Sequence, residues 1–332
     1  MNTPPVADVQ VTLVLWHSDP QLVAATCAAL ARQTTRLSTL RVLVNESDRH
    51  EAEAWAGRLR AIGPAGRVLV QASAGNAGFA GGHNRLLAQA FASGADHALI
   101  VNPDLALEEK AVERLLDFAV SLPGPSICGP VLELARLDDG RLSGLGTLDT
   151  VGIRWTRTGR HLDAGQGQPL STAPHQPHAV AGVSGACMLV TAGAHERFVR
   201  ESGEFFDEDF IAYREDAELG LRAAMLGVAL WVVPQARGLH VRTQRGTGRG
   251  GSAFVDRLGV RNRFLIAFKY GTRRPGGWCG ALLRDLTVLL AVMLCERSSW
   301  LGVREAFVLR SRMHRKRATV RAAAAGRAGS GS

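Results

Sequence analysis

The sequence lacks the features by which several classes of protein are identified. Its five cysteines are an odd number without a CxxC spacing, which argues against a disulfide framework or a zinc site and favours a reducing compartment. The first ten residues, MNTPPVADVQ, hold prolines and an acid where a secretory signal holds a basic patch and an apolar run. We therefore expect a cytoplasmic protein. With only two tyrosines to stack on bases and no nucleic-acid motif, we expect no nucleic acid as partner.

Long hydrophobic runs are also scarce. The apolar run at residues 286–295 has about half the length needed to span a bilayer, and charged residues adjoin both ends. We interpret residues 280–317 as one or two amphipathic helices that lie on an anionic membrane surface, at the inner face of the plasma membrane. The basic residues that would face the headgroups are Arg310, Arg312, Arg315, Lys316 and Arg317. The alternative is a helix that packs on the core and has a solvated basic end.

The 332-residue chain has a net charge of +9, which is unevenly distributed. Residues 1–236 hold 19 Lys and Arg against 26 Asp and Glu, a net of −7. Residues 237–332 hold 20 against 4, a net of +16. A cationic C-terminal region without a nucleic-acid motif favours lipid or phosphate as the partner.

The first half of the sequence alternates strand and helix patterns with short links. Apolar, β-branched runs predict strands at residues 9–16, 40–45, 67–71 and 97–102, and helical spacing predicts helices at 21–34, 51–62, 84–93 and 108–120. This alternation predicts a mostly parallel central sheet with right-handed crossovers, flanked by helices. In such sheets ligands bind at the carboxyl ends of the strands.

The second half is less regular. Residues 128–180 indicate a loop-rich or hairpin-bearing insert, residues 180–191 and 229–233 predict strands, and the glycine- and arginine-rich residues 237–251 predict a mobile loop. Helical patterns follow. We divide the chain into a domain at 1–250, a basic amphipathic helical region at 251–320 and a disordered tail at 321–332.

An acidic segment at residues 203–222, GEFFDEDFIAYREDAELGLR, is the most informative stretch. It places seven carboxylates among aromatic residues, an arrangement that suits a site for a cation or for taking a proton from a substrate hydroxyl. Asp216 directly precedes a helical run, where the helix dipole would keep its carboxylate ionised. The alternative interpretation is a helix cap on an acidic surface.

Two further patterns follow predicted strands. Asn102 and Asp104, in the sequence NPD, lie at the end of a strand, and such a carboxylate suits Mg²⁺ or Mn²⁺, although NPD alone is also a common turn. His240 follows a later strand and is either structural or a ligand. Asn76, Gly78 and Asn84 belong to GNAGFAGGHN, in which glycines allow a ligand to approach the backbone and the amides can read polar groups.

Taken in order, these motifs resemble the family 2 glycosyltransferases, which are inverting sugar-nucleotide enzymes of GT-A fold, and in particular their rhamnosyltransferase-like branch. VTLVLWHS, RVLVNESD, GNAGFAGGHN, LIVNPD, and VSGACMLV with the acidic segment match five family motifs across about residues 9–270. The chain departs from the family pattern at Val44, at Trp16-His17 and at Ala217-Glu218. The resemblance implies an α/β GT-A (nucleotide-diphospho-sugar transferase) fold with a C-terminal helical extension.

The resemblance also implies roles for individual residues. Asp104 would bind the Mg²⁺ or Mn²⁺ that bridges the donor diphosphate, with His240 as a further ligand. Asp216, in a catalytic pair with Glu215, would be the general base. The expected donor-binding residues are Trp16, Asn45, Asn76, Gly78, Asn84, Asn102, Arg242 and Arg245.

The implied activity is transfer of a sugar, rhamnose in this branch, from a nucleotide-diphosphate sugar donor to a lipid-linked or polysaccharide acceptor in cell-surface glycan synthesis. One alternative is a non-catalytic module of the same fold that binds sugar nucleotides or membranes. Another is a nucleotidyltransferase, but HSDP at residues 17–20 does not supply the basic glycine-rich loop that it would need.

Overall fold

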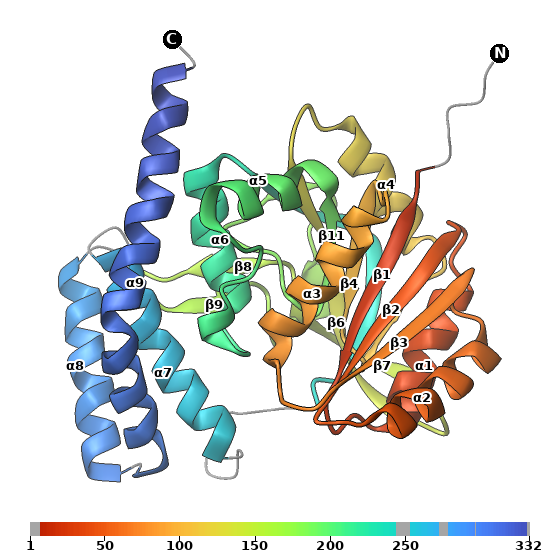
Figure 1. The fold of residues 1–332 in the computed structure, drawn as a ribbon, viewed down its shortest axis with the longest axis horizontal. Coiled ribbons are helices and arrows are strands. Elements are labelled where there is room, and N and C mark those ends of the chain that lie inside the picture. Colours follow the sequence, from red (N-terminus) through yellow and green to blue (C-terminus); the bar gives the residue numbers. More distant parts are fainter. Residues whose placement is uncertain (1–6, 244–252, 272–277, 296, 331–332) are drawn as a thin grey trace.

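The structure is a computed structural model that describes residues 7–243, 253–271, 278–295 and 297–330. A ten-stranded sheet runs through the molecule, and three long C-terminal helices lie along one side of it (Figure 1). The sheet consists of β1 (Val9–Leu15), β2 (Leu37–Asn45), β3 (Arg67–Ser73), β4 (His97–Val101), β5 (Leu105–Leu107), β6 (Ser126–Asp138), β7 (Arg141–Thr150), β10 (His178–Ala179), β11 (Cys187–Thr191) and β12 (Ala229–His240). A separate hairpin consists of β8 (Ile153–Trp155) and β9 (His161–Asp163).

Helices cover both faces of the sheet. The helices are α1 (Pro20–Ala31), α2 (Arg49–Ile62), α3 (Gly78–Ala92), α4 (Ala111–Ser121), α5 (Ala192–Ser202), α6 (Glu215–Leu226), α7 (Ala253–Tyr270), α8 (Trp278–Cys295) and α9 (Arg297–Ser330). Apolar residues of α1, α2 and α4 form one core cluster with the sheet, and those of α3, α5 and α6 form another. The predicted sheet flanked by helices is confirmed.

The strand order is β10-β12-β6-β11-β4-β1-β2-β3. β1 pairs in parallel with β2 and β4, β2 with β3, and β6 with β12, whereas β11 runs antiparallel between β4 and β6. β1, β2, β4, β6 and β12 therefore all end at the same edge of the sheet. This edge carries the candidate site.

Residues 128–180, predicted to be a loop-rich or hairpin-bearing insert, hold hairpins and also most of a strand of the central sheet. β6 is a 13-residue strand of the central sheet, although Gly129 and Pro130 interrupt its apolar pattern. Glycine is needed at position 129, because an added Cβ would lie 2.4 Å from Val183 Cγ1. The predicted hairpins are present, as β6–β7 and β8–β9. The strand predicted at 180–191 is restricted to β11, and β12 extends to His240, inside the predicted mobile loop.

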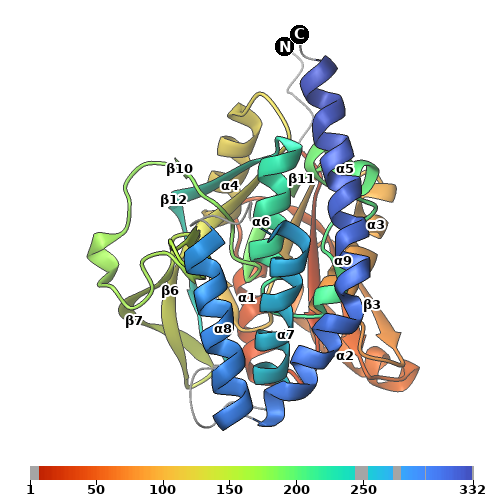
Figure 2. The same cartoon turned by 90° about the vertical axis from the view of Figure 1, so that its left-hand side faces the viewer.

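The C-terminal helices form a bundle that packs on the sheet domain (Figure 2). Residues of α7 such as Phe264 and Leu265 share an apolar cluster with Ala306 and Met313 of α9. The predicted disorder at 321–332 is wrong for the described part of this range, because α9 continues to Ser330. Its last turns are alanine-rich, and Arg327 pairs with Glu201. In the part of the chain that the structure describes, no helix has the length and hydrophobicity needed to cross a bilayer.

Candidate active site

The strand ends bring most of the predicted site residues to one edge. Trp16 follows β1, Asn45 ends β2, Asn102 and Asp104 follow β4, and His240 ends β12. These positions span more than 200 residues of the sequence. The parallel arrangement of their strands brings them to the same edge of the sheet. Arg245 lies outside the described residues, so its donor-binding role stays a prediction.

Asp104 and His240 face one another below this edge. His240 Nε2 lies 3.3 Å from Asp104 Oδ1, and the backbone and side chain of Thr243 donate hydrogen bonds to Asp104 Oδ2. Burial opposes ionisation of Asp104, but His240 and Thr243 outweigh it and lower the pKa of the carboxyl to about 2. Asp104 is therefore a fixed carboxylate at neutral pH.

The Asp104–His240 pair has the chemistry of a partial site for a divalent cation. The one partner of the buried Asp104 Oδ1 among the described residues is His240 Nε2, and a cation bound here would replace the proton between these two atoms. Two ligands in adjacent octahedral positions around Mg²⁺ lie about 3 Å apart, close to the separation of Asp104 Oδ1 and His240 Nε2. Within the described ranges, no group of three or more His, Cys, Asp and Glu side chains is arranged to hold a metal ion. A cation here would need further oxygens, which a diphosphate can supply.

His240 also contacts a carboxylate that sequence reasoning missed. Its Nδ1 lies 2.8 Å from Asp149 Oδ2, and Asp149 is fully buried at the end of β7. Burial lowers the pKa of His240, but hydrogen bonds with Asp104 and Asp149 outweigh it and raise the pKa to about 9. Asp149 lies in LGTLDT, where no motif indicates a function, so only the fold could identify it.

Arg242 continues this network toward the proposed base. Its guanidinium pairs with Asp149, and its Nη2 lies 2.5 Å from Asp163 Oδ2 of β9. Both Asp163 and Arg242 act electrostatically on Asp216, the former raising and the latter lowering its pKa. Asp104 and Asp216 are thus joined by a short series of charged side chains. Because two carboxylates already bind Arg242, its predicted contact with a donor diphosphate would require it to change partners.

Asp216 is the second residue of α6. Its Oδ2 accepts a hydrogen bond from the Gly185 N–H at 3.1 Å, and its Oδ1 accepts one from Ala217 at 2.7 Å. Burial raises the pKa of Asp216, and Asp163 adds to this, while the two N–H groups and Arg242 oppose it. These contacts fix the direction of the carboxylate, but burial opposes the ionisation that the sequence predicted for an acid at a helix N-terminus.

Glu215, the other member of the predicted pair, lies in a different environment. It is buried, and no described residue hydrogen-bonds its Oε2. Burial, followed by the charge of Asp216, raises the pKa of Glu215 well above its ordinary value. Glu215 is therefore the harder of the two to ionise, and Asp216 is the first to carry the negative charge of the pair.

The asparagine–glycine motif closes the edge between β2 and α3. Asn45 Oδ1 accepts a hydrogen bond from the Ala77 N–H, and Asn76 Oδ1 accepts one from Gly78. Gly78 has φ of +68°, and an added Cβ would lie 2.4 Å from the Ile211 carbonyl oxygen, so only glycine fits. These side chains shape the loop that would face a donor, and whether they also bind it stays a prediction.

Asn84 lies farther along α3 and joins it to the acidic segment. Its amide donates to the Phe206 carbonyl oxygen at 2.8 Å and to Glu208 Oε1 at 3.1 Å, and its oxygen accepts from the Phe206 N–H at 2.8 Å. With its amide satisfied by the protein, Asn84 positions the segment that leads to Asp216. No polar contact of the Asn102 side chain is seen in the described residues.

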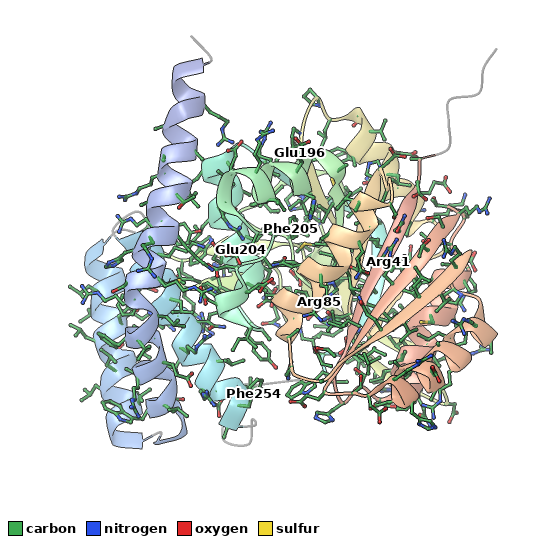
Figure 3. All side chains as sticks on the ribbon, in the orientation of Figure 1. Arg41, Arg85, Glu196, Glu204, Phe205 and Phe254 are labelled. Atoms are coloured by element: carbon green, nitrogen blue, oxygen red, sulfur yellow. The ribbon has the colours of Figure 1, made fainter. Side chains whose placement is uncertain are left out.

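Trp16 follows β1 and is half-buried. Its indole Nε1 donates to Glu46 Oε2 at 2.7 Å, and its ring lies 5.4 Å from that of Phe254 at the start of α7. Figure 3 shows Phe254 at the end of α7 that approaches the sheet domain. An aromatic pair at this position could stack on a base.

The acidic segment differs from the expectation that it holds an external cation. Lys269 Nζ of α7 lies 2.6 Å from Asp207 and 2.7 Å from Glu218, and Lys316 Nζ of α9 lies within 2.7 Å of Glu204, Asp207 and Asp209. Glu204 lies on the side that faces α9 (Figure 3). The cations of this segment belong to the protein itself, and Asp216 remains outside this network.

The chain resembles known glycosyltransferases in sequence and in fold. The sequence model of the family described as "Glycosyltransferase like family 2" matches residues 4–262. The chain is 28% identical over 203 residues to the N-acetylglucosaminyl-diphospho-decaprenol L-rhamnosyltransferases of two Mycobacterium tuberculosis strains, CDC 1551 / Oshkosh and ATCC 25618 / H37Rv. The match covers 57% of this chain and 59% of each relative.

Two solved structures share the fold. GalNAc-T7 with UDP, GalNAc and Mn²⁺ superimposes with a TM-score of 0.60 at 13% identity, over 81% of this chain and 49% of that protein. TarS of S. aureus superimposes with a TM-score of 0.50 at 13% identity, over 94% of this chain and 53% of that protein. The predicted GT-A fold with a C-terminal helical extension is confirmed.

Proposed function

The chain belongs to glycosyltransferase family 2, and on that premise we propose that it transfers rhamnose from a nucleoside-diphosphate donor to a lipid-linked or polysaccharide acceptor in cell-surface glycan synthesis. The observation that supports this most directly is the series of contacts from Asp104 through His240 and Asp149 to Arg242, which acts electrostatically on Asp216. It brings a group suited to a donor diphosphate and a group suited to a proton to the same edge of the sheet. The rhamnosyltransferase relatives support the choice of sugar and of a lipid-linked acceptor.

The proposed reaction is a single displacement. The Asp216 carboxylate takes the proton of the acceptor hydroxyl, and the acceptor oxygen forms a bond to the anomeric carbon. The bond from that carbon to the diphosphate oxygen breaks, and its electron pair leaves with the nucleoside diphosphate. Attack from the opposite face inverts the anomeric centre. The N–H groups of Gly185 and Ala217 aim Asp216 at the acceptor.

We also propose that Asp104 and His240 hold a Mg²⁺ or Mn²⁺ ion when donor is present. Such an ion supplies positive charge for the oxygens of the diphosphate. The observation that favours this assignment is the 3.3 Å separation of Asp104 Oδ1 and His240 Nε2, between which an ion would replace the Nε2 proton. Thr243 and Asp149 hold the two ligands in place.

The D216N variant tests the role of Asp216. Asparagine keeps the size of the side chain and can still accept from Gly185, but it cannot take a proton, so we expect kcat to fall by about 10²–10⁴-fold. Donor binding, measured by thermal shift with dTDP-rhamnose and Mn²⁺, should stay within about twofold of wild type. Turnover close to that of wild type would show that Asp216 is not the base. A wild-type protein that binds donor but transfers no sugar would instead favour the non-catalytic alternative.

Metal removal tests the role of Asp104. Exhaustive treatment with EDTA should abolish transfer, and added Mn²⁺ should restore it. In D104N, the Mn²⁺ concentration for half-maximal activity should rise by about tenfold or more, since a neutral amide replaces a charged ligand. Activity that persists after EDTA treatment would contradict this assignment.

We propose in addition that the protein binds the inner face of the plasma membrane through α8 and α9. Large apolar side chains are exposed on these helices, namely Leu282, Leu283, Leu286, Leu290, Trp300, Leu301, Phe307 and Val308. Exposed Arg304 and Arg315 lie on α9, together with Trp300, Leu301, Phe307 and Val308. Apolar residues together with arginines match an anionic bilayer surface. Arg312 and Lys316, however, pair with acids of the sheet domain, so the structure corrects their predicted contact with headgroups.

A further inference from the structure

A group of basic side chains lies beside Asp216, on the side formed by the hairpin β8–β9 and the C-terminal helices. We call it the basic cluster; its members are Arg160, His161, Arg214, Arg263 and Arg284. Arg214 Nη1 lies 3.1 Å from His161 Nδ1, and Arg214 Nε donates to the Gly259 carbonyl oxygen of α7 at 2.9 Å. Arg214 directly precedes the Glu215-Asp216 pair, at the N-cap of α6, where its φ is +70°.

The positive charge of this cluster is only partly compensated. Asp285 of α8 accepts from Arg263, with its Oδ1 at 2.7 Å from Nη2, and Asp216 acts on Arg214 electrostatically. No carboxylate among the described residues pairs with Arg160, Arg214 or Arg284. Burial, followed by the charges of Arg263, Arg160 and Arg284, lowers the pKa of Arg214 to about 10. An arginine whose pKa is lowered by burial and by neighbouring arginines is stabilised in its charged form by an anion bound beside it.

Two buried N–H groups of this region also lack a partner. They are Arg284 Nε and Trp155 Nε1, neither of which has a hydrogen bond within the described residues. The Trp155 ring lies 5.8 Å from that of His161. Buried donors without partners are costly, and the oxygens of a phosphate group would satisfy them.

The cluster is accessible and rigidly supported. Arg160 is exposed, and Arg284 and Arg214 are half-buried, so a ligand can reach them from solvent. The start of α8 rests on the hairpin, because a Cβ added at Gly280 would lie 3.4 Å from the Arg157 carbonyl oxygen. Figure 1 shows β8 and β9 reaching from the sheet domain toward the helices. The residues of the basic cluster lie on the β8–β9 hairpin, on α7 and α8 and at the start of α6, whereas Asp104 follows β4. The cluster and Asp104 therefore belong to different parts of the fold.

We propose that the basic cluster binds a phosphate or diphosphate group carried by the acceptor, next to the hydroxyl from which Asp216 takes a proton. This rests on the proposed function. A sugar attached through phosphate would place its hydroxyl at Asp216 and its charge at Arg160, Arg214 and Arg284. A guanidinium group can donate two parallel hydrogen bonds to one phosphate group, and such a bidentate contact would fix the orientation of the acceptor.

Two acceptors, one with a diphosphate and one without, test this proposal. One is N-acetylglucosaminyl diphosphate with a short prenyl chain, and the other is the uncharged octyl glycoside of N-acetylglucosamine. In the full-length R160A and R284A variants, KM for the diphosphate acceptor should rise about tenfold, while KM for the octyl glycoside and for the donor stays within about twofold. R154A, an exposed arginine in the same hairpin, is the matched control. An equal rise in KM for both acceptors, or a rise for the donor alone, would overturn the assignment.

A binding measurement separates this proposal from the proposed function. Inorganic pyrophosphate is titrated into the full-length protein by calorimetry in metal-free buffer, which needs no turnover. Affinity should fall about tenfold in R160A and R284A and stay unchanged in R154A and D104N. If the wild-type protein transfers no sugar, the proposed function fails, yet this titration still reports on the cluster. Pyrophosphate affinity that is the same in R160A, R284A and wild type would refute the site.

Discussion

Glu215 and Asp216 are adjacent carboxyl groups with different surroundings. Asp216 accepts two backbone N–H groups, whereas no described donor reaches Glu215 Oε2. Groups of one type whose environments separate their pKa values can hold different protonation states at one pH. Because Glu215 is the harder of the two to ionise, Asp216 is the proposed base, and its raised pKa places the expected acid limb of the activity profile above the range of an ordinary aspartate.

The E215Q variant tests the protonation state of Glu215. Since its folded-state pKa is raised, the folded protein keeps a proton that the unfolded chain releases, so Glu215 lowers the free energy of unfolding as pH rises above the ordinary glutamate range. E215Q cannot ionise and escapes this loss. We expect the stability gain of E215Q over wild type, measured by urea denaturation, to increase between pH 5 and pH 8 by about 1 kcal/mol or more. E109Q, at an exposed position, should show no such trend. A difference between E215Q and wild type that does not change with pH would contradict this account.

At the residue scale, the sequence identified side chains that belong to motifs. Asp104, His240 and Asp216 lie where strand ends and a helix N-terminus place them, because those positions follow from local patterns. Asp149, Asp163 and Arg214 were missed, since their importance comes from contacts with residues distant in the sequence. Asn84 shows the opposite case: it belongs to a motif, yet its amide is satisfied by Phe206 and Glu208.

At the scale of elements, the N-terminal half followed from the sequence better than the centre. Strands β1 to β4 are apolar runs between helices, and their periodicity is unambiguous. β6 contains glycine and proline, and it is placed by its partners β12 and β11, which sequence periodicity cannot reveal. α9 extends beyond the predicted limit because Arg327 and Val320 contact α5 and α6.

Helix α9 is attached to the acidic segment by Lys316. The chain has three lysines, and two of them, Lys269 and Lys316, neutralise this segment. In K316M, Glu204, Asp207 and Asp209 would lose a shared cation, so we expect the free energy of unfolding to fall by about 3 kcal/mol. Because the segment leads to Asp216, kcat should fall as well, while donor binding is retained. Urea denaturation and transfer assays measure the two effects.

The control for K316M is R315M, at the neighbouring exposed position of α9. It removes a charge of the same sign without removing a partner of the acidic segment. Its stability should stay within about 0.5 kcal/mol of wild type. Equal destabilisation of R315M and K316M would show that the net charge of α9, and not the Lys316 ion pairs, stabilises the docked helix.

At the scale of the whole molecule, the charge asymmetry has an internal use. The acidic first part and the basic last part meet where Lys269, Arg312, Lys316 and Arg327 pair with acids of the sheet domain. The sequence alone attributed this basic charge to lipid or phosphate, because the fold that brings the two parts together was not visible in it. Among the residues that the structure describes, basic side chains that remain for an external partner include those that face outward on α9 and those of the basic cluster.

Membrane binding should therefore depend on the exposed apolar side chains of α8 and α9 more than on the total charge. Leu283 is 65% exposed and Val308 is 75% exposed. Serine at either position removes apolar area that would enter the headgroup region, so the L283S and V308S variants should each bind vesicles of phosphatidylglycerol and phosphatidylcholine about tenfold more weakly than wild type in sedimentation assays. V120S is the matched control, because Val120 is 69% exposed on α4, away from these helices. Binding to purely phosphatidylcholine vesicles should be weaker for all variants, since Arg304 and Arg315 then lack an anionic partner. Equal vesicle binding by V120S, L283S and V308S would exclude this surface as the membrane contact. We expect transfer to the uncharged octyl glycoside in solution to be unaffected in all three variants.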